Sequence, residues 1–319
     1  MPTQVCEKTF HAWPQTLAIC LDRVPAQAVT GAVIEGIGEF SLVQEDGALP
    51  TVLAAGSALG ESGVSILSMR FQGGVHFSAV PRQHLIWFQL SDVRIECCRA
   101  GRRFRQDVPA GSVAICPAKV DCGADAEESV DALLVCVDPG KLSLAAAEDS
   151  VLNVRLHERL SDFDETLLDL ARTLALESEQ NYPNGTLFWN VAAEDFIARL
   201  VARHTSEPDR RARGMLSKDI FKRIKDYVVA HLDEAIDVAA LANIAGRSPF
   251  HFSRVFAQSI GVTPHRYVVY VRLQRAIELV REGRRGLAEI AACTGFADQS
   301  HLWRWVRRVY GVSLTELAN

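Results

Sequence analysis

Hydrophobic residues follow two different spacings along the chain, and the spacing changes near residue 160. Before that point, short apolar runs of strand length lie between turn residues, as at residues 84–90 and 130–137. Residues 93–97 alternate between apolar and polar side chains, and residues 112–116 form another short apolar segment. Many short strands at this spacing predict a sandwich or barrel over residues 1–150.

Beyond residue 160 the apolar residues recur at helical spacing. Residues 161–164 form a plausible capping box for one helix, and residues 181–185 form a turn before a second helix that Thr186 can cap. The apolar positions that recur at helical spacing in this helical pair, over residues 155–205, are Phe163, Leu167, Leu170, Leu174, Phe188, Val191, Ala192, Phe196, Leu200 and Val201.

A polar and charged segment then separates the chain into two parts. Residues 207–214 combine Pro, Gly and several charges, which is typical of a linker. We therefore place the linker at residues 206–216 and an all-α domain at residues 217–319.

The all-α domain contains a segment that occurs twice. Leu241, Ala242 and Gly246 match Ile290, Ala291 and Gly295 at an offset of 49 residues. Further matching pairs, at an offset of 50 residues, are Ser248 with Asp298, Arg254 with Arg304, and Gly261 with Gly311. A second copy of about fifty residues predicts two successive structural units of the same kind.

Each copy has the features of a helix-turn-helix. A small residue permits close crossing of two helices, a glycine follows at a helix end that favours positive φ, and Ser248 or Asp298 caps the next helix. That helix directs Phe252 and Phe256, or Leu302 and Val306, inward and leaves an arginine on another face. Such a unit suits the DNA major groove.

A long helix is predicted between the two copies, after Thr263 and Pro264. Roughly 18 residues at about 1.5 Å each span about 27 Å. With the flanking units, this length suits two reading helices on the order of 34 Å apart, one turn of DNA. A single subunit is therefore predicted to read two consecutive grooves.

Charge is distributed unevenly between the two parts. Residues 213–319 carry 16 Lys and Arg against 10 Asp and Glu, a net charge of +6, whereas residues 1–212 carry 18 against 29, a net charge of −11. A basic domain attached to an acidic body is expected when only one domain meets a polyanion.

Other sequence features bear on where the protein acts. The sequence has no apolar stretch long enough for a membrane helix, and its first residues lack the basic start and apolar run of a signal peptide. The eight cysteines include no Cys-x-x-Cys pair, so we expect reduced thiols, with Cys116 and Cys136 in the core. We predict a cytoplasmic protein without membrane association.

The two repeats carry a family resemblance. Residues 248–256, Ser-Pro-Phe-His-Phe-Ser-Arg-Val-Phe, and residues 290–302, Ile-Ala-Ala-Cys-Thr-Gly-Phe-Ala-Asp-Gln-Ser-His-Leu, make residues 217–319 similar to the AraC/XylS family of transcription regulators. The second unit departs from the family pattern at Trp303, Trp305 and Val306. The resemblance implies an α+β chain, in which an N-terminal cupin-like β-barrel and a helical pair precede a double helix-turn-helix domain.

Position within each motif predicts the DNA contacts. Arg254 and Arg304 are the candidates for bases, because a guanidinium can bond guanine O6 and N7 together. Trp303 either presses on thymine methyl groups or folds back onto its own domain. The full predicted set is Ser248, Phe250, His251, Ser253, Arg254, Gln299, Ser300, His301, Trp303 and Arg304.

The N-terminal half carries no motif of comparable specificity. The resemblance implies a small-molecule effector there and a helical pair that dimerises; packing of the pair on its own barrel stays open. Arg99 and Arg103 resemble the phosphate clamp of some cyclic-dinucleotide receptors, provided that a three-residue loop joins their strands. With a two-residue turn at Ala100 and Gly101 they would point to opposite faces.

Enzymatic and metal-binding alternatives find little support in the sequence. The five histidines of the N-terminal half include no His-x-His pair, so we expect no metal, no cofactor and no catalytic residue. The predicted function is a DNA-binding regulator that binds double-stranded promoter DNA, contacts RNA polymerase and responds to an effector. The alternative is control by protein partners without a small ligand.

Overall fold

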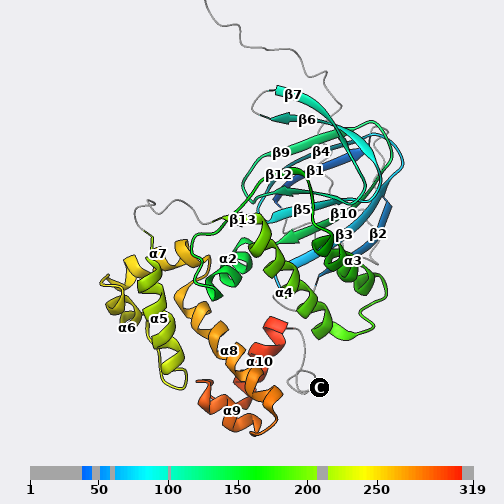
Figure 1. Ribbon diagram of the computed structural model, residues 1–319. Coiled ribbons are helices and arrows are strands. Elements are labelled where there is room, and N and C mark those ends of the chain that lie inside the picture. The colour runs from blue at the N-terminus through cyan, green and yellow to red at the C-terminus, as the bar shows by residue number, and fades with distance from the viewer. Residues whose placement is uncertain (1–37, 45–50, 58–61, 100–101, 207–214, 311–319) are drawn as a thin grey trace, which may run out of the picture.

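A computed structural model describes residues 38–44, 51–57, 62–99, 102–206 and 215–310. Most of the predicted linker, the Ala100-Gly101 turn and the end of the second repeat at residues 311–319 lie outside this range. Figure 1 shows two layers of strands at one end of the molecule and a group of helices at the other.

The strands form two antiparallel sheets. The five-stranded sheet has the order β1 (Gly38–Gln44), β4 (Val75–Pro81), β9 (Cys122–Ala126), β6 (Val93–Arg99) and β7 (Arg102–Val108). The six-stranded sheet has the order β12 (Arg159–Phe163), β8 (Ser112–Cys116), β5 (His84–Gln89), β10 (Val130–Val137), β3 (Val64–Phe71) and β2 (Thr51–Ser57). Two short strands, β11 (Arg155–Leu156) and β13 (Thr205–Ser206), pair separately. Among the described residues the strands form two sheets and not the closed barrel that the family resemblance implied.

The apolar residues 132–137 of β10 follow from the place of this strand within the six-stranded sheet. Leu133, Val135 and Val137 face a core shared with the helical pair, whereas Leu134 and Cys136 face the core between the two sheets. Because side chains alternate along a strand, a strand covered on both faces needs apolar residues at every position.

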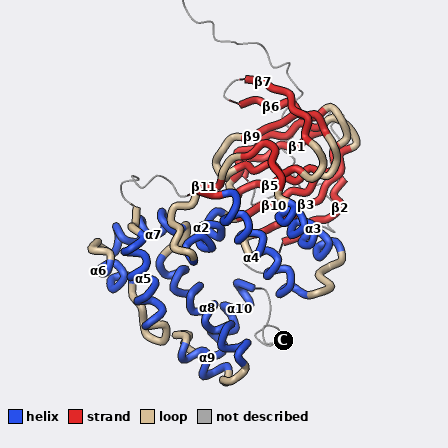
Figure 2. The backbone as a smooth tube through the Cα atoms, in the orientation of Figure 1, coloured by secondary structure: helices blue, strands red, loops and turns tan. Residues whose placement is uncertain are grey.

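Helices cover the outer face of the six-stranded sheet. They are α2 (Pro139–Glu148), α3 (Glu165–Glu179) and α4 (Gly185–His204). In Figure 2, α2 and α4 lie between the strands and the C-terminal helices. The predicted helical pair is therefore present as α3 and α4, and α2 is an additional helix within the region expected to contain only strands.

Only some of the apolar positions at helical spacing in the helical pair are buried. Phe163 belongs to strand β12 and is 61% exposed, because the helix begins after Asp164. Phe188 and Val191 are 42% and 41% exposed, whereas the polar residue Asn190 is buried. Helix α4 buries this mixed set of residues because it packs against α2, α3 and α10 (Gln299–Tyr310), which lie on different sides of it.

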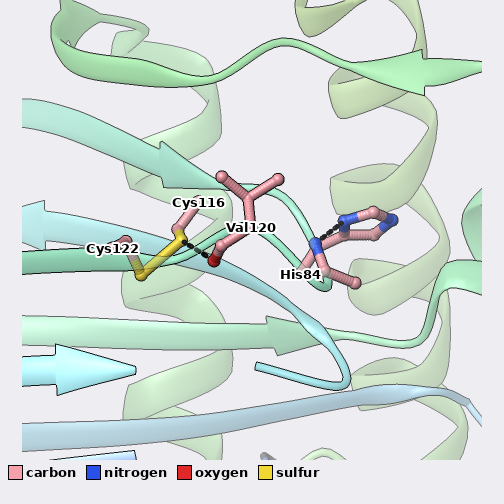
Figure 3. The surroundings of a disulfide bond; sticks show 5 residues. His84, Cys116, Val120 and Cys122 are labelled. Atoms are coloured by element: carbon pink, nitrogen blue, oxygen red, sulfur yellow. Dashed lines mark hydrogen bonds between the residues drawn. A yellow bond between two sulfur atoms is a disulfide. The ribbon is translucent and has the colours of Figure 1, made fainter. Parts of the chain in front are cut away.

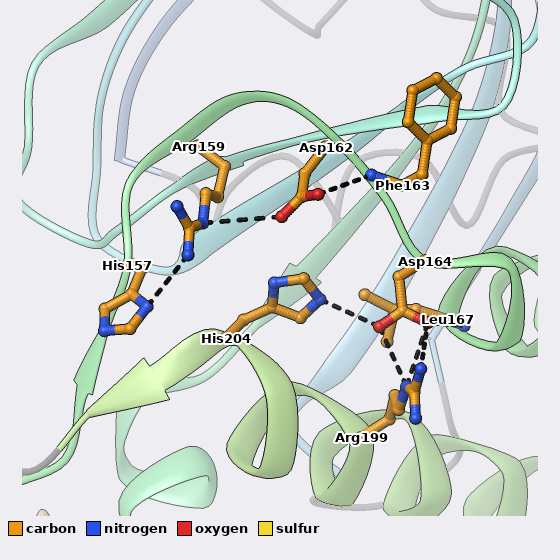
Figure 4. Close-up of polar contacts among 8 residues, drawn as sticks. All are labelled: His157, Arg159, Asp162, Phe163, Asp164, Leu167, Arg199 and His204. Carbon is orange, nitrogen blue, oxygen red and sulfur yellow. Dashed lines mark hydrogen bonds and ion pairs between the residues drawn. The ribbon is translucent and has the colours of Figure 1, made fainter.

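A buried ion pair fixes the start of α3 against the end of α4 (Figure 4). The carboxylate of Asp164 accepts hydrogen bonds from Arg199 at 2.9 Å and from His204 Nε2 at 3.0 Å, and from the backbone N–H of Leu167 at 3.1 Å. Burial alone would raise the pKa of Asp164, but these donors outweigh it and hold that pKa below its ordinary value. The ionised carboxylate of Asp164 therefore connects the start of α3 to the end of α4.

The C-terminal helices are α5 (Lys218–Ala230), α6 (Val238–Ile244), α7 (Pro249–Ile260), α8 (Pro264–Glu282), α9 (Leu287–Cys293) and α10 (Gln299–Tyr310). Helices α5 to α7 share one core centred on Phe221, Phe252 and Phe256. A second core around Ile290, Leu302 and Val306 joins α9 and α10. Helix α8 contributes to both cores, so it connects two small helical units. No helix in the described ranges is long and apolar enough to span a membrane.

One disulfide corrects the expectation of reduced thiols. Cys116 at the end of β8 is bonded to Cys122 at the start of β9, and closes the loop between them (Figure 3). Cys136 is a buried free thiol, as predicted. The spacing of six residues between the bonded pair fits no short cysteine motif, so this disulfide could not be predicted from cysteine spacing.

Candidate nucleic-acid interface

The two repeats fold as two helix-turn-helix units, α6 with α7 and α9 with α10. Gly246 has φ +63° and Gly295 has φ +75°, which confirms the positive φ predicted at both turns. Ala242 and Ala291 are fully buried where the helices of each unit cross. The repeat therefore places α7 and α10 in equivalent positions.

The starts of the two helices are capped differently. Asp298 accepts a hydrogen bond from the backbone N–H of His301 at 2.7 Å, which confirms its predicted capping role. Ser248 occupies the same position before α7, but its hydroxyl makes no capping bond, and the Pro249 that follows has no N–H to be satisfied. The side chain of Ser248 consequently remains exposed to solvent.

Helix α7 presents the predicted DNA-facing residues on its outer surface. Phe250 is 83% exposed, and His251 and Arg254 are also exposed, while Phe252 and Phe256 are buried beneath them. The Ser253 hydroxyl donates to the carbonyl of Pro249 at 2.9 Å, so it is partly committed within the helix.

A neighbouring arginine that the prediction did not include orients His251. Arg247, in the turn before α7, donates a hydrogen bond to Nε2 of His251. Because a guanidinium is always protonated, the imidazole must be neutral at that nitrogen to accept. Arg247 and Arg254 therefore bring two positive charges to the exposed end of α7, which contains no Asp or Glu.

Helix α10 presents Gln299, Ser300, Trp303 and Arg304 to solvent. Trp303 is 40% exposed, and the guanidinium of Arg307 lies 5.2 Å from the centre of its ring. The indole therefore lies at the surface beneath a cation.

His301 differs from the other predicted contacts. It is half-buried, with Nδ1 3.3 Å from the backbone N–H of Ala297 and Nε2 3.0 Å from the indole N–H of Trp305. A neutral imidazole has only one acceptor nitrogen, so only one of these donors is satisfied at a time. His301 thus holds the start of α10 together from within its own unit.

The sequence prediction missed two arginines on α10. Arg307 and Arg308 are exposed, and Arg308 lies 5.3 Å from the ring centre of Trp305. Together with Arg304 they give the outer surface of α10 three guanidinium groups, and the helix contains no Asp or Glu. Their spacing of three and four residues from Arg304 is the signal that could have found them.

The N-terminal half forms hydrogen bonds to the C-terminal ends of α7 and α10. The backbone N–H of Asn153 donates to the carbonyl of Ser259 at 3.1 Å, and Asn190 Nδ2 donates to the carbonyl of Tyr310 at 2.6 Å. Ser259 and Tyr310 lie near the C-terminal ends of α7 and α10, respectively. The N-terminal ends, which carry the predicted DNA contacts, stay exposed.

A cavity of about 360 Å³ lies between the two sheets. Its walls are mostly apolar and include Phe77, Trp87, Ile95 and Val108, with Gln89 and Arg159 among the polar groups. The indole N–H of Trp87 donates to Gln89 Oε1 at 3.2 Å. A volume of this size, with few polar groups, is typical of small-molecule sites.

The disulfide, which Figure 3 shows with its surroundings, belongs to the wall of this cavity. Cys116, Val120 and Cys122 all line it, and Cys116 Sγ lies 3.6 Å from the carbonyl oxygen of Val120. A disulfide sulfur has no proton to donate, so this is a packing contact. Nearby, His84 Nδ1 accepts a hydrogen bond from the backbone N–H of Ala118 at 2.9 Å, and burial lowers the pKa of His84 to about 4.

The strand register bears directly on the predicted arginine clamp. Arg99 pairs with Arg102, and Cys98 pairs with Arg103, at the described end of the β6–β7 ladder. Adjacent register positions belong to opposite faces of a hairpin, so this register does not favour the clamp. The turn itself, at Ala100 and Gly101, lies outside the described residues. In the described part of the chain, moreover, no three His, Cys, Asp or Glu side chains gather closely enough to hold a metal ion.

Comparisons with known proteins match the C-terminal part. Residues 241–319 match the family model described as a helix-turn-helix domain. The chain is 37% identical over 92 residues to a probable transcriptional regulator LumQ of Photobacterium leiognathi, which covers 29% of this chain and 37% of that protein. It is 34% identical over 87 residues to the HTH-type transcriptional activator RhaS of Escherichia fergusonii, covering 27% of this chain and 31% of the relative.

Longer matches are weaker. The HTH-type transcriptional regulator MtrA of Neisseria gonorrhoeae is 27% identical over 145 residues, 44% of this chain and 48% of that protein. The chain thus spans half or less of the length of these three relatives.

Solved structures include ToxT from Vibrio cholerae, with a TM-score of 0.33 and 12% identity over 80% of this chain and 98% of that one. An AraC-type regulator from Chromobacterium violaceum has a TM-score of 0.30 and 22% identity over 32% of this chain and 90% of that one. At these scores no residue correspondence can be drawn. The repeat, its geometry and the sequence matches agree: the C-terminal part of this chain carries two helix-turn-helix units and is similar to the DNA-binding domains of HTH-type transcriptional regulators.

Proposed function

We propose that the protein is a sequence-specific transcriptional regulator that reads promoter DNA with both helix-turn-helix units. The exposed ends of α7 and α10 carry this proposal. Each presents arginines, polar groups and one large aromatic residue, and neither helix contains an acidic side chain. Phosphates and guanine edges are recognised by such surfaces.

Arg254 and Arg304 are assigned to base contacts and Arg307 and Arg308 to phosphates. Ser248, Phe250, His251, Ser253, Gln299, Ser300 and Trp303 supply the remaining contacts, and His301 supports them from within. The regulator acts in the cytoplasm, where the promoter lies, and contact with RNA polymerase would make it an activator.

Gel-shift titration of the full chain tests this proposal, with DNA selected from a random pool. Arg254→Ala and Arg304→Ala should each weaken specific binding by about 1–3 kcal/mol and relax the preference at one base position. Arg307→Ala should weaken binding to all sequences alike and reduce the salt dependence.

Arg172→Ala provides the matched control, because Arg172 lies on α3 and pairs with Asp169 at 3.5 Å, away from the reading helices. It should leave affinity unchanged. Equal affinity of wild type and Arg304→Ala for the selected site would remove Arg304 from the set of base-reading residues.

The N-terminal half is proposed to hold the effector in the cavity between its sheets, in the role that a cupin-like domain has in the family. Its apolar walls favour an aromatic or aliphatic molecule with few polar groups over a cyclic dinucleotide, whose two phosphates need cationic partners. No cofactor and no catalytic role are proposed.

Control by protein partners is the alternative to a small effector. Leu176, Phe188 and Val191 are exposed apolar residues of the helical pair and are candidates for contact with a second copy of the chain. Ligands that raise the melting temperature of the wild type, but not of Ala114→Phe, which narrows the cavity, would favour the effector. A concentration-dependent change in mass would favour dimerisation.

A further inference from the structure

A second cavity lies between the N-terminal half and the helix-turn-helix domain. Its volume is about 310 Å³, and it is bounded by α2 and α4 on one side and by α8 and α10 on the other. In Figure 1 these four helices meet near the centre of the molecule. The cavity is separate from the one between the sheets, since the two share no lining residue.

One buried group in this cavity lacks a hydrogen-bond partner. Asn190 is 3% exposed, and its Nδ2 donates to the carbonyl of Tyr310 at 2.6 Å. A carbonyl only accepts, so the amide orientation is fixed and Oδ1 is the remaining atom. Oδ1 is buried and accepts no hydrogen bond from any described residue. An unsatisfied acceptor that lines a cavity calls for a donor inside it.

The charged groups around the cavity are mostly acidic. Glu148, Asp149, Glu194 and Asp195 line it, against one lysine, Lys141. Burial raises the pKa of Glu194, and the neighbouring carboxylates of Glu148 and Asp195 raise it further, against the opposing effects of Lys141 and Arg281. The side chain of Glu194 is nevertheless exposed to solvent, because it lines an open cavity. A cation in the cavity would reduce the repulsion among these carboxylates.

The remaining wall is apolar. Leu144 and Ala145 of α2 and Ile197, Ala198 and Val201 of α4 contribute hydrocarbon surface. The cavity is small and negatively charged, has an apolar wall and contains an acceptor that needs a hydrogen-bond donor. These features fit a ligand that has an ammonium group on a short hydrocarbon chain.

We propose that this interdomain cavity is a ligand site for small aliphatic amines. The ammonium group donates to Asn190 Oδ1 and to the carboxylates of Glu148 and Glu194, and the hydrocarbon chain packs on Leu144, Ile197 and Val201. A bound amine bridges α2 and α4 to α8 and α10 and therefore favours the docked arrangement of the two halves. This inference does not depend on the effector proposed for the cavity between the sheets.

Calorimetric titration of the full chain without DNA tests the proposal with a charge series of one chain length. Hexylamine and 1,6-diaminohexane should bind and raise the melting temperature, whereas 1-hexanol and hexanoate should not. Because the attraction is electrostatic, added salt should weaken the amines' binding. Equal binding of hexylamine and 1-hexanol would overturn the proposal, as would no binding of either amine, which would mean a cavity filled by water only.

Substitutions locate the site. Glu194→Gln removes one charge at constant shape, from a side chain that forms no hydrogen bond with another described residue, and should weaken hexylamine binding about tenfold. Ala198→Met fills the cavity from an exposed wall position and should abolish binding. Glu179→Gln on α3 is the matched control, because Glu179 is exposed and does not line the cavity.

Unchanged binding in both Glu194→Gln and Ala198→Met would place the amine elsewhere and overturn the proposal. DNA binding is measured separately on the same variants. Loss of amine binding with unchanged DNA affinity would show that this site is separate from the DNA-binding surface. Because the amine titration uses no DNA, its result does not depend on whether the DNA-binding proposal is correct.

Discussion

Individual polar residues hold the N-terminal half together where its apolar cores end. His84 is one of them: it lies at the start of β5, largely buried, and accepts a hydrogen bond from the loop that the disulfide closes. Burial favours the neutral imidazole and lowers its pKa to about 4, although Asp138 acts in the opposite direction. Stability should therefore depend on pH through this side chain.

The sign of that dependence follows from the two pKa values. Between the ordinary value of 6.5 and about 4, the unfolded chain binds a proton on His84 that the folded chain does not. His84 therefore lowers the free energy of unfolding as the pH falls through this window, by about 2 kcal/mol near pH 5.

Urea unfolding of wild type and His84→Asn at about pH 7.5 and about pH 5 measures this contribution. Asparagine keeps an acceptor at the δ position for Ala118 but does not titrate, so the variant should lose less stability on acidification. The same loss in both proteins would show that His84 does not control it.

At the scale of elements, the two repeats use equivalent glycines in unequal surroundings. A Cβ atom on Gly246 would meet nothing within 4 Å, whereas one on Gly295 would lie 2.0 Å from the carbonyl oxygen of Leu232. Arg272 of α8 donates to that same carbonyl at 3.1 Å, so the second turn packs tightly against α8 and the loop after α5.

Alanine at the two positions separates backbone strain from packing. Gly246→Ala should cost about 1 kcal/mol, because only the positive φ is disfavoured. Gly295→Ala should cost at least about 2 kcal/mol more, because the clash is with backbone that cannot rotate away. Thermal unfolding compares the variants, and equal losses would contradict the close approach in the second unit.

Local sequence patterns were sufficient to predict those elements whose structure depends mainly on residues near them in the chain. The strands at β5, β8 and β10 and both helix-turn-helix units follow from periodicity, turn glycines and caps. Helix α2 was missed because Asp138-Pro139 is compatible with a turn and also with an N-cap followed by Pro at the first helical position. Local chemistry does not distinguish the two.

The rest of the site depends on partners distant in sequence. Phe188 and Val191 have helical spacing toward a core, but α4 turns Asn190 inward because its partner is the carbonyl of Tyr310, 120 residues away. The Cys116–Cys122 pair and the interdomain cavity arise in the same way, from segments that only the tertiary fold brings together. The Arg99 and Arg103 hypothesis depends on the length of the turn between them, which the sequence alone does not decide, and the strand register beside that turn does not favour it.

At the scale of the whole molecule, the N-terminal half meets both helix-turn-helix units at once. Helix α2 contributes Leu144 and Ala147 to the core of the first unit, and α4 bonds to the end of α10 in the second. Lys225 of α5 also donates to the backbone carbonyl of Glu148 at 2.8 Å. A change in the position of α2 and α4 would consequently reach both reading helices, while their DNA-facing ends stay free.

The central claim is that one chain reads DNA with two units held apart by α8, which spans about 28 Å at about 1.5 Å per residue. Footprinting on a site selected from a random pool tests it most directly. We predict protection of two major-groove segments about one helical turn apart, and loss of affinity of about tenfold or more when roughly half a turn of DNA is inserted between them. Protection of a single segment, with affinity unaffected by the insertion, would contradict the claim.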